Sequence, residues 1–80
     1  MSVSNDTRAE FASIAVTMYA FKKEGHNNYD NRADMAGDLL TDLLHLVRRE
    51  GGDPDAKLRM ARVNFEAEEA GEQTIQELRL

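Results

Sequence analysis

Residues 36–68 read AGDLLTDLLHLVRREGGDPDAKLRMARVNFEAE, and this stretch decides the fold. In its first half, leucines recur at three- and four-residue spacing, which predicts an amphipathic helix over about 31–50. The leucines cover more than a narrow stripe of that helix, so we expect it to be central and packed on both sides. Gly37 lies inside the pattern, and we expect another backbone to come close to it.

The middle of the stretch, Gly51-Gly52-Asp53-Pro54, predicts a tight turn between two helices. Glycine ends a helix readily because it adopts the left-handed backbone conformation without strain. Asp53 can cap the next helix, and Pro54 suits a first helical position, where a missing N–H costs nothing. We expect this third helix to end near Ala70.

Before this stretch, the sequence predicts a first helix over about 8–24. Thr7 and Glu10 match the capping-box pattern, in which both side chains satisfy free backbone donors. Gly25 is the expected stop. Apolar residues at helical spacing define one face of this helix, namely Phe11, Ile14, Ala15, Met18 and Phe21.

The predicted fold is all-α: a compact bundle of three main helices forming a single domain over residues 1–80. Gly71 is expected to end the third helix, leaving 72–80 as a short fourth helix or a frayed tail. The predicted core consists of Phe11, Ile14, Met18, Phe21, Leu39, Leu40, Leu43, Leu44, Val47, Leu58, Ala61 and Phe65.

Composition narrows the class of protein. The chain has 80 residues and no cysteine, so neither disulfides nor thiolate–metal clusters can hold it together. The N-terminus lacks the order of a signal peptide, and no apolar run is long enough to span a bilayer. We therefore expect a cytoplasmic protein that does not enter membranes, located in the host cytoplasm if a phage encodes it.

Charge is distributed unevenly along a chain whose formal net charge is −5. The acidic total argues against a general nucleic-acid-binding protein, because such proteins carry a basic surplus. Arginines gather around the central turn and glutamates follow them. This distribution predicts a surface that binds a charged partner protein. The predicted surface consists of Arg48, Arg49, Arg59, Arg62, Glu66, Glu68, Glu69 and Glu72.

A metal site is the main catalytic alternative. Asp38, Asp42 and His45 share one side of the second predicted helix, and their carboxylate and imidazole groups suit a divalent metal. Glu66 and Glu69 could face them from the third helix. Helical nucleotide pyrophosphohydrolases bind magnesium through acidic pairs on facing helices, but their Glu-x-x-Glu pattern is replaced here by Asp-x-x-x-Asp. We therefore expect no bound metal, no cofactor and no catalytic residue.

A second alternative is a helix-turn-helix DNA-binding regulator. The two helices of residues 36–68 are joined by a short turn, and Arg59 and Arg62 lie on the second helix. The acidic net charge and the glycine-proline turn argue against this interpretation.

The same stretch resembles a recurring type of small helical accessory protein from bacteriophages and other bacterial mobile elements. The resemblance rests on the leucine-rich segment DLLTDLLHL at 38–46, the acidic-glycine turn at 50–55, and Phe65-Glu66-Ala67-Glu68. It implies a mobile-element origin and brings no catalytic residues. Small acidic proteins of this kind often bind host machinery, including CRISPR effectors.

These observations favour a non-enzymatic protein-binding module, whose partner would be a host or defence-system protein. The resemblance extends this expectation to an anti-CRISPR-like inhibitor of a bacterial defence complex. The leucine content of residues 31–50 exceeds what a three-helix monomer can cover, so a homodimer is also expected.

Overall fold

The structure is a computed structural model that describes residues 4–26 and 31–78, with side chains described for 4–26 and 31–71. It confirms the all-α class. The described residues form helix α1 (Asn5–Glu24), helix α2 (Arg32–Arg49) and helix α3 (Pro54–Leu78), and include no strand. The expected stop at Gly71 is wrong, because α3 continues through that residue. A helix-interior glycine costs only about 1 kcal/mol, which flanking helix-forming residues offset. Residues 72–78 therefore extend α3.

Each helix begins directly after a residue whose side chain caps the helix N-terminus. Ser4 caps α1 by accepting a hydrogen bond from the Thr7 backbone N–H at 3.1 Å, so the cap lies three positions before the Thr7 predicted from sequence. Asn31 caps α2 in the same way through the Asp34 N–H. The expected cap of α3 is confirmed, since the Asp53 carboxylate accepts a hydrogen bond from the Asp55 N–H at 3.0 Å.

The turn between α2 and α3 has the predicted glycine stop. Gly51 adopts the left-handed conformation with φ of 84°, and its N–H donates to the Arg48 carbonyl at 3.1 Å. The Gly52 N–H donates to the Val47 carbonyl at 2.9 Å. This pair of bonds is the Schellman motif, which satisfies carbonyl groups that the helix end would otherwise leave free. The motif turns the chain sharply into α3.

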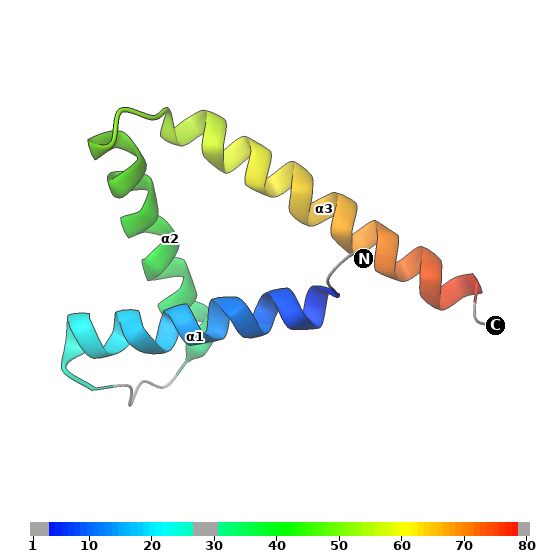
Figure 1. Cartoon of the computed structure of the whole chain (residues 1–80), viewed down its shortest axis with the longest axis horizontal. Helices are drawn as coiled ribbons and strands as arrows, with labels where there is room; N and C mark the ends of the chain where they lie inside the picture. The colour runs from blue at the N-terminus through cyan, green and yellow to red at the C-terminus, as the bar shows by residue number, and fades with distance from the viewer. Residues whose placement is uncertain (1–3, 27–30, 79–80) are drawn as a thin grey trace.

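The three helices are arranged as the sides of an open triangle (Figure 1). α1 crosses the N-terminal part of α2, the other end of α2 turns into α3, and α3 runs back past the start of α1. The radius of gyration is 15.2 Å, whereas about 12 Å is expected for a compact domain of this length. Each pair of helices therefore meets over a short length.

The core lies where α1 crosses α2, and it is small. Val16, Ala20 and Met35 are the buried hydrophobic residues among those described, and Tyr19 and Leu39 pack against them. None of the buried three belongs to the predicted core. Of the predicted set, Leu39, Leu44 and Val47 are half-buried, while Phe11, Ile14, Met18, Phe21, Leu40, Leu43, Leu58, Ala61 and Phe65 are exposed.

The predicted core was wrong because α1 has apolar residues on two opposite sides. Its contact with α2 uses the side that carries small residues, where Ala20 is fully buried. Small side chains let two helix backbones approach closely where they cross. A stripe of large side chains would hold the two backbones apart. The close approach expected at Gly37 is also wrong, since a Cβ added there would meet nothing within 4 Å.

Candidate functional site

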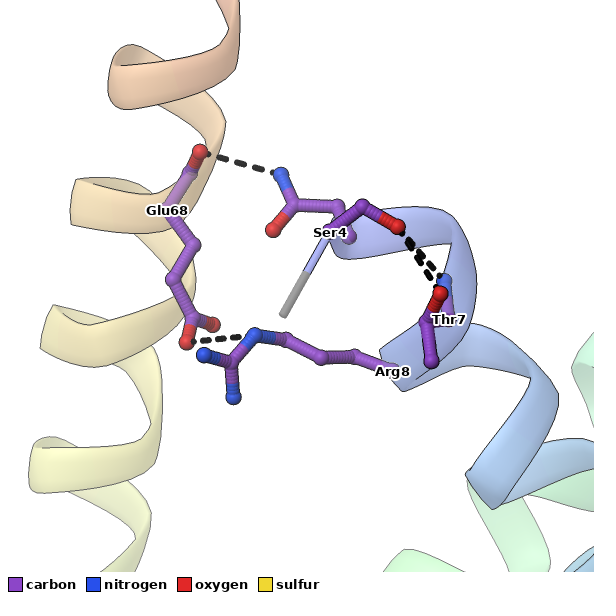
Figure 2. Close-up of polar contacts among 5 residues, drawn as sticks. Ser4, Thr7, Arg8 and Glu68 are labelled. Carbon is purple, nitrogen blue, oxygen red and sulfur yellow. Dashed lines mark hydrogen bonds and ion pairs between the residues drawn. The ribbon is translucent and has the colours of Figure 1, made fainter. Parts of the chain in front are cut away.

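The strongest candidate for a binding surface is the junction at which α1 meets α3. The Arg8 guanidinium of α1 lies 3.1 Å from the Glu68 carboxylate of α3, and the two side chains are 46% and 34% exposed. The Asn5 side-chain amide donates to the Glu68 backbone carbonyl at 2.9 Å. Figure 2 shows both contacts beside the Ser4–Thr7 cap. Two side chains of the first helical turns thus hold one turn of α3.

A shallow hollow lies along this junction, between the first turns of α1 and the middle of α3. Phe65 borders it and is 59% exposed, which is high for an aromatic side chain. Asp6, Glu68 and Glu69 place carboxylates around it, against the single guanidinium of Arg8. The lining consists of Asn5, Asp6, Arg8, Ala9, Phe65, Glu68 and Glu69, which we call the junction surface.

Three of the predicted charged residues of α3 mix positive and negative charge on one side of the helix. Arg59, Arg62 and Glu66 are spaced at i, i+3 and i+7, which places them on one side of α3. The Arg62 guanidinium lies 3.2 Å from the Glu66 carboxylate. The pair is exposed and partly neutralises itself, so this side of α3 carries mixed charge.

Two of the predicted arginines and two of the predicted glutamates lie at different corners of the triangle that the helices form (Figure 1). Arg48 and Arg49 lie in the last turn of α2, where Arg49 forms an exposed ion pair with Glu50 at 3.5 Å. Glu68 and Glu69 lie at the α1–α3 junction. Glu72 lies on α3, but its side chain is outside the described residues. Arg48 and Arg49 therefore lie at a different corner from Glu68 and Glu69.

Two of the three candidate metal ligands of α2, Asp38 and Asp42, contact side chains of α1. Asp42 accepts a hydrogen bond from the Tyr19 hydroxyl, and Asp38 forms an ion pair with Lys23 at 3.4 Å. His45 lies nearby on α2 and is exposed. Across the part of the chain that the structure describes, no three carboxylate or imidazole residues are placed to hold a metal ion.

These contacts raise the pKa values of Tyr19 and Lys23, the two titratable groups that α1 contributes to them. The hydrogen bond to Asp42 raises the pKa of Tyr19, with a further rise from partial desolvation. The hydrogen bond with Tyr19 raises the pKa of Lys23, whose ammonium also lies 5.4 Å from the Tyr19 ring centre. Tyr19, Lys23, Asp38 and Asp42 thus form a polar seam that orients α1 on α2.

Sequence reasoning missed most of the junction surface. It placed Phe65 in the core and gave no role to Asn5, Asp6 or Arg8. No local pattern could have identified these residues, because the contact of Asn5 with Glu68 joins positions 63 residues apart. The one available signal was a basic residue, Arg8, close to the start of a helix, where acidic residues are favoured.

Comparison of the chain with protein-family models, curated proteins and solved structures found no match. Among the described residues, no helix combines the length and apolar character needed to cross a membrane.

Proposed function

We propose that this protein is a non-enzymatic protein-binding module that recognises a partner through the junction surface. The observation that supports the proposal is the 59% exposure of Phe65, which lines a hollow together with charged residues. Aromatic side chains surrounded by a polar rim are typical of the residues that dominate protein–protein binding energy.

The charge of the junction surface indicates the chemistry of the partner. Asp6, Glu68 and Glu69 outnumber Arg8, and Arg8 already pairs with Glu68. The net acidic surface favours a partner with a basic patch, and the chain's formal charge of −5 adds long-range attraction. Basic patches are common on proteins that bind nucleic acids, so an acidic module can compete for such a patch.

The resemblance of residues 36–68 to phage and mobile-element proteins supports a narrower form of the proposal. In that form, the partner is a component of a bacterial defence complex, and binding inhibits it in the manner of an anti-CRISPR protein. Phe65 and Glu68 belong to the segment that carries the resemblance and also border the junction surface.

Affinity capture from a bacterial lysate, followed by binding measurements with the purified captured protein, tests the proposal. Phe65→Ala should weaken binding by about 30-fold or more, as expected for a central aromatic residue. Val63→Ala is the matched control, since Val63 is 52% exposed on the opposite side of α3. Equal binding by wild type and Phe65→Ala would contradict the assignment of the junction surface.

A pair of charge variants tests the chemistry of the partner separately. The double substitution Asp6→Asn and Glu69→Gln keeps the shape of the hollow and should weaken binding most at low salt. Arg59→Gln with Arg62→Gln removes charge from the mixed side of α3 and should have a smaller effect. A larger loss from the arginine pair would move the binding surface to the predicted basic residues.

A further inference from the structure

The junction surface is assembled from two helices that lie far apart in the sequence. Arg8 and Ala9 come from the first two turns of α1, whereas Phe65 and Glu69 come from the middle of α3. The surface is therefore complete only while α3 lies against the start of α1. Whatever holds this corner of the triangle closed also controls whether the junction surface exists.

The α1–α3 corner is held differently from the other two corners. The buried core lies where α1 crosses α2, and α2 and α3 are joined by the short turn between them. At the α1–α3 corner, the Arg8 guanidinium and the Asn5 amide both contact Glu68, as Figure 2 shows. The Arg8 and Glu68 side chains are partly exposed, so dissolved salt ions reach the pair.

Helix α3 is long enough for a small rotation to open this corner. The helix is continuous from Pro54 to Leu78, so it can move as a rigid body about the turn at its start. The part of α3 from Pro54 to Glu68 is about 21 Å long, and a rotation of about 20° would move Glu68 by roughly 7 Å. The Arg8 and Glu68 side chains lie only 3.1 Å apart, so this rotation separates them.

We propose that the Arg8–Glu68 ion pair is a salt-sensitive latch that closes the junction surface. In the closed state, the pair holds α3 against the start of α1 and completes the hollow. In the open state, α3 has rotated away, and Phe65 and Arg8 no longer line one surface. The role of the latch rests on the proposed function, since the surface that it closes is the proposed binding surface.

The charges at the corner give the latch a distinctive dependence on salt. On α1, Arg8 and Asp6 carry opposite charges, whereas Glu68 and Glu69 of α3 are both negative. Coulomb energy falls with distance, so the attraction within the pair at 3.1 Å dominates, and salt favours the open state by weakening it. Without Arg8, only carboxylates face one another across the corner. Salt then favours the closed state, because it screens their repulsion.

Single-molecule fluorescence energy transfer in the full chain tests the latch. The chain has no cysteine, so Ala12→Cys in α1 and Ala67→Cys in α3 attach one dye on each side of the corner. Both positions are exposed, and neither lines the junction surface. Raising the sodium chloride concentration from about 0.05 M to about 1 M should increase the ratio of open to closed molecules by about 3-fold, as expected for an exposed ion pair.

A second dye pair controls for effects of salt on the dyes. Ala12→Cys with Ala36→Cys labels α1 and α2, whose crossing contains the core, and its transfer efficiency should not change with salt. A transfer efficiency between α1 and α3 that is equally constant would overturn the proposal. This comparison changes no residue of the corner, so it gives an answer even where a corner variant fails to fold.

Variants of the ion pair provide a sharper test with the α1–α3 dyes. Arg8→Ala should raise the ratio of open to closed molecules by about 3-fold at low salt and reverse the response to salt. Arg62→Ala is the matched control, because Arg62 pairs with Glu66 within α3 at 3.2 Å, and it should behave as wild type. The charge swap Arg8→Glu with Glu68→Arg should restore the closed state. Equal behaviour of Arg8→Ala and Arg62→Ala, or a swap that stays open, would overturn the latch.

The latch and the proposed function can fail separately. Energy transfer is measured on the free chain, whereas the proposed function is tested by the loss of binding in Phe65→Ala. Salt-dependent opening together with full binding by Phe65→Ala would support the latch and contradict the proposed binding surface. Constant energy transfer together with weakened binding by Phe65→Ala would overturn the latch and leave the proposed function standing.

Discussion

The Arg8 guanidinium in α1 lies 3.1 Å from the Glu68 carboxylate in α3, and this ion pair joins the two helices at the α1–α3 corner of the triangle. A second contact at this corner, from the Asn5 side-chain amide to the Glu68 backbone carbonyl, is also polar. Partly exposed polar contacts add little stability, because water competes for the same groups. The α1–α3 contact is therefore the weakest of the three corners.

A double-mutant cycle on Arg8 and Glu68 measures the strength of this corner. Arg8→Ala and Glu68→Ala should show a coupling free energy of about 0.5 kcal/mol, as expected for an exposed ion pair. Chemical denaturation at fixed protein concentration supplies the four unfolding free energies. A coupling that persists in high salt would contradict the exposed character of the pair.

Gly37→Ala should stabilise the protein by about 1 kcal/mol. Gly37 lies inside α2, a Cβ there meets nothing within 4 Å, and alanine has the higher helix propensity. The midpoint of denaturant unfolding should rise with an unchanged slope. Gly71→Ala in α3 is a parallel case with the same open surroundings. Destabilisation by Gly37→Ala would show that another backbone lies against this position.

The helices could be predicted from sequence because their signals are local. The Asp53 cap, the Gly51 stop and the leucine spacing each act within a few residues, and each is present in the structure. The break expected at Gly71 failed because its helix-forming neighbours continue the helix across it. Local sequence signals therefore predict a helix boundary well where several of them coincide, as at Gly51 and Asp53. They predict it poorly where a single glycine is the only signal, as at Gly71.

The core and the junction surface could not be predicted, because both depend on which side of α1 faces α2. The side with Phe11 and Met18 has the larger apolar area, so it was assigned to the core, yet the crossing uses the side with Val16 and Ala20. A monomer's sequence pattern does not distinguish a surface that packs within the chain from one that packs on a partner.

Gly51→Ala should destabilise the protein by about 1 kcal/mol. Gly51 has φ of 84°, a conformation that strains a residue with a Cβ. Gly51→Asn should cost less, because asparagine tolerates the left-handed region. Thermal unfolding of the two variants at one concentration gives the comparison. Equal stability of wild type and Gly51→Ala would mean that the Schellman turn does not form.

Tyr19→Phe should destabilise the protein in a pH-dependent way. The Tyr19 hydroxyl donates to Asp42, and this hydrogen bond raises the pKa of Tyr19 above its ordinary value of 10.0. Because the folded-state pKa is the higher one, the stabilisation is complete below the ordinary value and is lost as the pH rises through the folded pKa. The stability gap between wild type and Tyr19→Phe should therefore be constant from about pH 7 to 9 and narrow above about pH 10. Asp42→Asn, which leaves a neutral acceptor, should reduce that pH dependence. Wild-type and Tyr19→Phe stabilities that run parallel above pH 10 would show that Asp42 does not bind the hydroxyl in solution.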